Sequence, residues 1–399
     1  MSGYELHQKL RTKTVRQVKK KQYDEAISTL YQGAIDLLDQ KEQGSACDLA
    51  LYMIDVYGFK SQQVDSESRD RITEILGKAQ PDFWRKKVID AALKWSAKAS
   101  DAPAGDPLLR LYIAKMLAKE SAYHLAEPHF ISACIPAPTT YTIESAPKAF
   151  AQMMLDWLVE HSKAATEVEG ETRDTNAIER IEAGRFALRG VMPLLASRAV
   201  SPARSFLTGY IELTTTRQKS LLLPVQPNPR PYVPPGSSGS AAKSDLQLYL
   251  TANADLNFAQ MALALCIEGD RIKSTGSGSR AAPDWLKSAW TALVRQYERE
   301  AAALQQEEGV RETIPHLSAI YFDIQPPRAQ SNMLSDMMAS LFGGGGPAAG
   351  GASAARATQP AATSIKQAPP PSKPAQTAAP ASTSAPSAQA DDLVDDEMD

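Results

Sequence analysis

Residues 106–138, DPLLRLYIAKMLAKESAYHLAEPHFISACIPAP, predict two antiparallel helices joined by a short turn. In the second helix Ala126, Phe130 and Ala133 share one face, because residues three and four apart lie on the same side. Together with Pro138 they match the second half of the tetratricopeptide (TPR) pattern. Small residues let a neighbouring helix approach, and the aromatic ring fills the gap between helices. This stretch therefore predicts a helical-repeat fold.

Two residues of the stretch depart from the repeat template. Arg110 occupies the position where the template has tryptophan, although Ala114 supplies the expected small residue. Pro128 falls inside the second helix, where proline lacks the backbone N–H that would donate a helical hydrogen bond. It would be tolerated if that helix started late and held the ring in its first turn. These departures indicate a divergent solenoid rather than a peptide-binding TPR array.

The same spacing recurs near the start of the chain. The residues that repeat it are Tyr23, Ala26, Leu30 and Gly33. From Tyr23 to Tyr123 the offset is 100 residues, about three units of roughly 34 residues each. Ordinary packing of any antiparallel helix pair also produces this pattern, but helical periodicity continues on both sides of both segments. We therefore predict an all-α fold, a right-handed α-solenoid of TPR-like helix pairs. Residues 217–244 contain too many prolines for a helix and suit an extended arm, a small β-like insertion or a flexible loop.

The composition of the 399-residue chain changes after residue 342. From Gly343 onward Ala, Pro, Ser, Thr and Gln dominate, so the segment cannot bury enough surface to offset the entropy of ordering it. We expect N-terminal helical repeats at 1–148, C-terminal repeats at 149–342 and a disordered tail at 343–399. The apolar Met-rich stripe within 331–342 suits either the core or a docking helix.

Charge is distributed unevenly along the chain. Residues 9–21 contain seven Lys or Arg and no acid, whereas DDLVDDEMD at 391–399 contains six acids. On a helical wheel the cations Lys9, Lys13, Arg16 and Lys20 fall within an arc of about 60°. We call these four side chains the basic ridge. A solvated face is the commonest fate of such a ridge, but no acid at i+3 or i+4 screens these charges.

The basic ridge suits an acidic protein, a nucleic acid or an anionic membrane surface. We favour a protein partner, because aromatic residues do not interleave with the cations and the net charge of the chain is −3. The acidic segment 391–399 of the same chain is a further candidate for this ridge. We expect no stable membrane insertion, since no apolar run approaches the roughly 18 residues of a membrane span.

The sequence contains no recognisable catalytic, cofactor or metal motif. Its glycine runs follow no strand, it has no C-x-x-C pair, and its Ser, His and Asp residues form no triad order. His124 and His129 are five residues apart and so lie on different helix faces. We expect a non-enzymatic scaffold without cofactor or metal. The three cysteines lie in apolar patterns and no signal peptide is visible, which indicates a soluble protein of a reducing compartment.

Four segments in order resemble the Golgi-to-ER traffic protein 4 family. They are YDEAISTLYQGAIDLL at 23–38, GDPLLRLYIAKMLAKESAYHLAEPHF at 105–130, LNFAQMALALCIEG at 256–269 and HLSAIYFDIQPPRAQSNMLSDMMASLF at 316–342. The last combines an aromatic pair, a Pro-Pro segment and a Leu/Met helix, as that family does at its close. The resemblance covers residues 4–342 and leaves the proline-rich segment 224–235 and the tail unexplained.

The resemblance implies a non-catalytic cytosolic adaptor in the guided-entry (GET) pathway for tail-anchored membrane proteins. In that family the N-terminal half docks the homodimeric targeting ATPase. The C-terminal half holds a ubiquitin-like-domain protein that recruits a co-chaperone, partly through a β-like insertion. Both 214–250 and 269–284 are candidates for that insertion. The alternative is a generic TPR-like co-chaperone that binds acidic peptides, for which the required Lys and Asn groove set is missing.

The resemblance also suggests which cations contact the ATPase. We assign contacts with its acidic face to Lys13, Arg16, Lys19 and Lys20, with Lys9 and Lys21 at the periphery. Lys19 lies off the arc of the ridge, so its assignment depends more on the family resemblance than on the helical wheel. By contrast, four apolar residues of the C-terminal motifs are expected in the core: Leu256, Phe258, Tyr321 and Phe322.

In the N-terminal half we expect Gly58 to end a helix.

Overall fold

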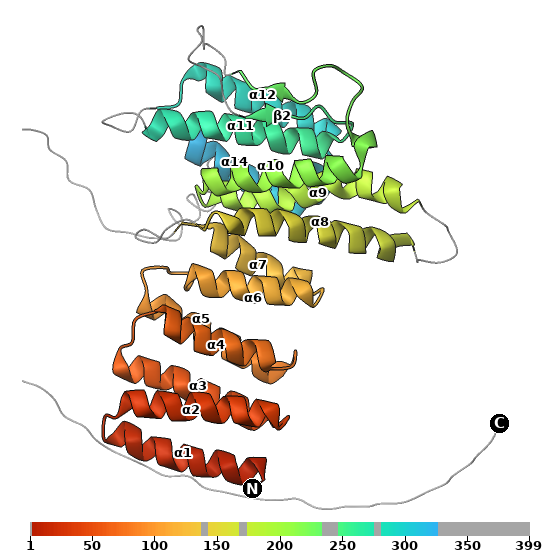
Figure 1. The fold of residues 1–399 in the computed structure, drawn as a ribbon. Coiled ribbons are helices and arrows are strands. Elements are labelled where there is room, and N and C mark those ends of the chain that lie inside the picture. Colours follow the sequence, from red (N-terminus) through yellow and green to blue (C-terminus); the bar gives the residue numbers. More distant parts are fainter. Residues whose placement is uncertain (1, 137–142, 167–173, 234–245, 275–280, 326–399) are drawn as a thin grey trace, which may run out of the picture. The chain divides into compact units, whose positions relative to one another are not determined.

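The computed structural model describes residues 2–136, 143–166, 174–233, 246–274 and 281–325. Within these ranges the regular elements are α-helices, one 3-10 helix (Lys219–Leu221) and two short strands (Figure 1). The helices are α1 Gly3–Lys19, α2 Tyr23–Asp39, α3 Gln43–Lys60, α4 Ser66–Lys78, α5 Phe83–Ala99, α6 Pro107–Lys119, α7 Tyr123–Cys134, α8 Ser145–Thr166, α9 Thr175–Ala196, α10 Val200–Arg217, α11 Ala254–Ser274, α12 Asp284–Glu300, α13 Ala302–Gln306 and α14 Glu308–Phe322.

The helices stack as successive pairs. Helix α2 packs on α3, α6 on α7, and α8 on α9, and the even-numbered helices from α2 to α10 contact one another in order. Helix α1 packs on α2 and α3 at the start of the stack, where Figure 1 draws it in red. The predicted all-α solenoid of helix pairs is confirmed.

Residues 106–136 form the predicted helix pair, α6 and α7. Asp106 caps α6, because its Oδ1 accepts the backbone N–H of Leu109 at 2.8 Å. In α7 the repeat residues Ala126, Phe130 and Ala133 are buried. The ring of Phe130 stacks on Phe150 of α8 with centroids 5.5 Å apart, so it joins this pair to the next layer. Pro138, the last residue of the pattern, lies outside the described residues.

The two departures from the template have separate outcomes. Pro128 lies in the second turn of α7, which begins at Tyr123, so a late helix start is wrong. Its ring is exposed. Arg110 replaces the tryptophan with a polar contact: its Nη1 lies 3.1 Å from Nδ1 of His129, and its Nε donates to the carbonyl of Ala104. A guanidinium only donates, so Nδ1 of His129 accepts and the ring is neutral.

This contact predicts a pH dependence of stability. Burial and the charge of Arg110 lower the pKa of His129 to about 4, from 6.5. Between these values the unfolded chain binds a proton that the folded chain excludes, so the free energy of unfolding falls as pH falls. From pH 7 to pH 5 we expect His129 to contribute a loss of roughly 2 kcal/mol. Urea denaturation of His129→Gln should show a correspondingly smaller loss than wild type.

The control is His124→Gln, which removes an exposed histidine from the same helix. It should keep the wild-type pH dependence. If His129→Gln and wild type lose the same stability between pH 7 and pH 5, the neutral buried ring is excluded.

The expected helix end at Gly58 is wrong. Helix α3 continues to Lys60 and ends at Ser61, which adopts the left-handed conformation with φ of 55°. A Cβ at Gly58 would meet no heavy atom within 4 Å, so nothing in the packing requires glycine there. By contrast, a Cβ at Gly184 of α9 would lie 2.6 Å from the backbone N of Leu256 and 2.2 Å from Oδ1 of Asn253. Gly184 thus permits the close approach of α9 and the start of α11.

These two glycines form a matched pair for mutation. Gly184→Ala should lower the free energy of unfolding by about 1–3 kcal/mol, because backbone has to move to make room for the methyl group. Gly58→Ala should raise it by about 0.5–1 kcal/mol, because alanine loses less entropy in a helix. Urea denaturation of both variants measures the difference. Equal stability of the two would contradict the close approach at Gly184.

The C-terminal half contains the β-like insertion, between α10 and α11. Strand β1 (Arg230–Pro231) pairs antiparallel with β2 (Gln247–Leu248), and Leu222 bridges to Thr251. Of the two candidate segments, 214–250 therefore carries the strands. In 269–284, α11 runs on to Ser274 and α12 starts at Asp284.

Two side-chain amides hold the backbone of this insertion, one from α11 and one from within the insertion. Gln260 of α11 exchanges two hydrogen bonds with the backbone of Tyr249, at 2.7 and 2.9 Å, as a neighbouring strand would. Asn228 does the same with Leu250, at 3.0 and 2.9 Å. The expected core residues of this half are confirmed, since Leu256, Phe258, Tyr321 and Phe322 are all at most 1% exposed. The Met-rich stripe at 331–342 and the tail lie outside the described residues.

Candidate partner-binding surface on the first helix

Local sequence defines both ends of α1. Ser2 and Glu5 form a capping box, in which Ser2 Oγ accepts the N–H of Glu5 at 3.2 Å and Glu5 Oε2 accepts the N–H of Ser2 at 3.1 Å. At the other end Lys21 turns the chain into α2 with a positive φ of 61°. The helix is therefore regular from Gly3 to Lys19, and its outer face extends over this whole length.

The apolar face of α1 packs on α2 and α3. Leu6, Leu10 and Val18 are partly buried against the core. Thr14 is fully buried, and its hydroxyl donates to the carbonyls of Leu10 and Arg11 within the helix. The pattern that places the apolar side chains inward also places the basic ridge outward, on the side away from α2 and α3.

One acid from α3 neutralises part of the charge of α1. Asp48 Oδ2 lies 2.6 Å from Nη1 of Arg11 and 2.8 Å from Nε2 of His7. The guanidinium of Arg11 also lies over the ring of Tyr52, 4.6 Å from its centroid. Arg11 therefore fastens α1 to α3. This role cannot be recognised from the sequence, because Asp48 is 37 residues away and only the packing of α1 on α3 brings the two together.

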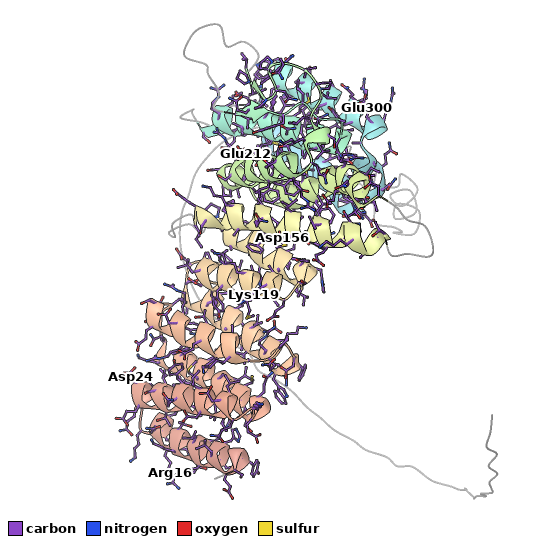
Figure 2. The ribbon with its side chains drawn as sticks, turned by 45° about the vertical axis from the view of Figure 1, so that its right-hand side comes forward. Arg16, Asp24, Lys119, Asp156, Glu212 and Glu300 are labelled. Atoms are coloured by element: carbon purple, nitrogen blue, oxygen red, sulfur yellow. The ribbon has the colours of Figure 1, made fainter. Side chains whose placement is uncertain are left out.

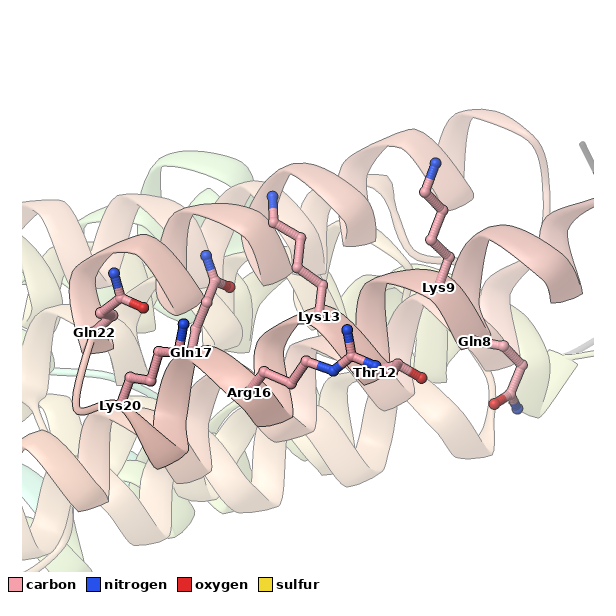
Figure 3. Close-up of a pocket in the computed structure, with 8 residues that line it drawn as sticks. All are labelled: Gln8, Lys9, Thr12, Lys13, Arg16, Gln17, Lys20 and Gln22. Carbon is pink, nitrogen blue, oxygen red and sulfur yellow. The ribbon is translucent and has the colours of Figure 1, made fainter.

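The predicted contact residues all lie on the surface. The exposed side chains are Lys9, Lys13, Arg16, Lys19, Lys20 and Lys21. The four members of the basic ridge line one shallow hollow together with Gln8, Thr12, Gln17 and Gln22 (Figure 3). Figure 2 shows Arg16 on the outer side of the first helix. The structure thus brings the ridge together, whereas Lys19 and Lys21 lie outside this hollow.

No ion pair neutralises the basic ridge within the part of the chain that the structure describes. The acids nearest in sequence have other partners. Glu5 closes the capping box, Asp24 binds Lys60 at 2.6 Å and Glu25 accepts a hydrogen bond from Gln22. Repulsion between the ridge cations therefore remains unrelieved, which favours an acidic ligand.

The geometry of the ridge fits a flat acidic surface or an extended acidic segment. Lys20 lies eleven positions after Lys9, which corresponds to roughly 17 Å along a helix at 1.5 Å per residue. Side chains at i and i+4 lie about 6 Å apart. The hollow between them is shallow, and all residues around it are polar or charged, so the ridge offers charge and donors rather than an enclosed pocket.

Two features of the described residues bear on other functions. No group of three or more His, Cys, Asp or Glu side chains there could hold a metal ion. None of the helices described is long and apolar enough to cross a membrane.

Comparison with known proteins gives one consistent family. The chain is 28% identical to the Golgi to ER traffic protein 4 of Schizosaccharomyces pombe, over 86% of this chain and 91% of that protein. It is 22% identical to the human homolog, over 85% and 82%. Among solved structures it matches the crystal structure of Get4 from C. therm., with a TM-score of 0.61 and 25% identity over 86% of this chain and 90% of that one.

A model of the family Golgi to ER traffic protein 4 matches residues 20–342. This range holds the helix pairs from α2 onward and the β-like insertion, and it begins after α1, so it does not reach most of the basic ridge. The match covers far more than half of the sequence. The chain belongs to the Golgi to ER traffic protein 4 family.

Proposed function

We propose that this chain is a non-catalytic cytosolic scaffold in the post-translational targeting of tail-anchored membrane proteins to the ER. It bridges the homodimeric targeting ATPase, through its N-terminal helices, to a ubiquitin-like-domain protein with its co-chaperone, through its C-terminal half. The observation that carries the proposal is the unneutralised basic ridge on the first helix of a solenoid from the Golgi to ER traffic protein 4 family.

The N-terminal interface is assigned to the cations of α1. Lys13, Arg16, Lys19 and Lys20 form its centre, and Lys9 and Lys21 its edge. All six are exposed and none has an acidic partner among the described residues. An acidic face of the ATPase would relieve their mutual repulsion. Because these charges are exposed, their contribution acts mainly on association and weakens as salt rises.

The C-terminal interface is assigned to the β-like insertion in 214–250. Two apolar side chains of this insertion face solvent, Leu223 at 40% exposed and Val233 at 64%. Asn228 donates to the carbonyl of Leu223, and the N–H of Tyr232, next to Val233, donates to the carbonyl of Leu246. Covering an exposed apolar side chain removes it from water and favours binding, so we assign the contact to these two residues.

The first test reverses three ridge charges, in Lys13→Glu/Arg16→Glu/Lys20→Glu. We expect affinity for the targeting ATPase to fall about 10- to 100-fold in calorimetry, since each reversal turns an attraction of up to about 1 kcal/mol into repulsion. Affinity for the ubiquitin-like-domain partner should not change. A normal affinity of the reversed chain for the ATPase, or capture of unrelated acidic C-terminal peptides in its place, would defeat the proposal.

The matched control reverses three exposed lysines of α5, in Lys86→Glu/Lys94→Glu/Lys98→Glu. These cations are also free of ion pairs among the described residues, but Asp90 lies four residues from both Lys86 and Lys94. The control changes the net charge by the same amount as the ridge reversal and should bind the ATPase as wild type does.

The second test removes the apolar surface of the insertion, in Leu223→Ser/Val233→Ser. Affinity for the ubiquitin-like-domain partner should fall at least about tenfold, because two apolar side chains leave the interface. Binding of the ATPase should persist. The control is Leu125→Ser/Ile181→Ser, which removes two exposed apolar side chains from α7 and α9. Equal affinities of the two double variants for the partner would reject the insertion as the interface.

A further inference from the structure

We propose that the acidic segment 391–399 of this same chain binds the basic ridge of α1 and competes there with acidic partners. The contact itself stands on the ridge and the sequence of the segment. Its consequence, autoinhibition of ATPase docking, rests on the function proposed above.

Charge complementarity is the first support. The ridge presents four cations along one side of a helix, with Lys19 and Lys21 beside it. The segment DDLVDDEMD offers six carboxylates in nine residues. In the described part of the chain, each acid close to the ridge in sequence, Glu5, Asp24 and Glu25, already has another partner. The segment therefore supplies the carboxylates that the described residues do not provide to the ridge.

The ridge also differs from the other basic surface on a described helix. On α5 the exposed lysines 86, 94 and 98 have Asp90 among them, four residues from two of them. Such alternation screens like charges within the helix itself. On α1 the residues from Lys9 to Lys21 contain no acid at all. The electrostatic attraction of an acidic segment is therefore stronger at α1 than at α5.

The length of the intervening chain permits the contact. Six successive helix contacts join α14 to α1, through α9, α7, α6, α4 and α2. With axes 8–10 Å apart, this path measures at most roughly 60 Å. The 65 residues from 326 to 390 extend to roughly 215 Å when fully stretched. As a random coil they would span roughly 45 Å, so the effective concentration of the segment at the ridge is substantial.

The test uses a fluorescein-labelled peptide of residues 386–399 and the full-length chain. One variant keeps the length of the chain but replaces the six acids by their amides (Asp391→Asn, Asp392→Asn, Asp395→Asn, Asp396→Asn, Glu397→Gln and Asp399→Asn). Fluorescence anisotropy at low salt should show that this variant binds the peptide about 3- to 10-fold more tightly than wild type, because its ridge is free. The difference should vanish near 0.5 M salt, where charges are screened within about 4 Å.

Two further variants, in the amide background, locate the site. Adding Lys13→Glu/Arg16→Glu/Lys20→Glu should remove peptide binding, whereas adding Lys86→Glu/Lys94→Glu/Lys98→Glu should leave most of it. The proposal is overturned if wild type and the amide variant bind the peptide equally. It is also overturned if the α5 reversal weakens binding as much as the ridge reversal does.

Zero-length carbodiimide cross-linking of wild type tests whether the contact lies within one chain. Mass spectrometry should find links from 391–399 to Lys9, Lys13 or Lys20 in monomers, at a yield that does not depend on protein concentration. Links found only in dimers, with a yield that rises with concentration, would assign the segment to a second copy and overturn the proposal.

The ATPase provides a separate readout. If the contact regulates docking, the amide variant should bind the targeting ATPase about 3- to 10-fold more tightly than wild type at low salt. If peptide and cross-linking results are positive but ATPase affinity is the same, the contact holds and the autoinhibition is overturned. If the ridge reversal itself leaves ATPase binding intact, the proposed function fails while the contact stands.

Discussion

The fold depends on the wedge that Phe130 forms between one helix pair and the next. Its ring stacks on Phe150 of α8, which contacts Phe206 of α10 at 4.6 Å between centroids, and Phe206 stacks in turn near Tyr210. All four side chains are almost fully buried. Gly190 of α9 leaves the space for Phe206, since a Cβ there would lie 2.1 Å from the ring. A helix pair cannot bury both of its faces alone, and this aromatic series supplies the shared interface.

Ion pairs between buried carboxylates and half-exposed arginines add direction to this apolar stacking. Arg189 of α9 forms a two-point contact with Glu127 of α7, at 2.6 and 2.8 Å. Arg217 of α10 holds Glu179 of α9 in the same way, and Glu179 is only 1% exposed. A carboxylate with so little solvent contact requires its partner in one position, because the unpaired charge would cost several kcal/mol, on the order of 3–5. These contacts thus fix how neighbouring helices lie against each other, more than they add net stability.

The sequence was sufficient for features that repeat at helical spacing. The burial of Ala126, Phe130 and Ala133 and the exposure of the basic ridge both follow from which residues share a helix face. Contacts that depend on a distant segment could not be predicted from the sequence. Asp48 of α3 binds Arg11 of α1, and Gln260 of α11 hydrogen-bonds the backbone of Tyr249 in the insertion. The predicted helix end at Gly58 was wrong for a different reason. No neighbouring atom requires glycine at this position, so its presence does not indicate where the helix ends.

The first helix illustrates what an uncovered helix face requires and what it does not. Among the described residues, α1 packs on α2 and α3 and no helix covers its outer face, so that face has to be polar. It does not have to be basic throughout, and α5 shows that lysines with an interspersed acid, Asp90, serve well on an exposed face. On α1 the like charges repel without relief from the described residues, which costs stability. An acidic ligand offsets that cost when it binds, whether it comes from another protein or from the far end of this chain. The ridge is therefore better explained by binding than by solubility.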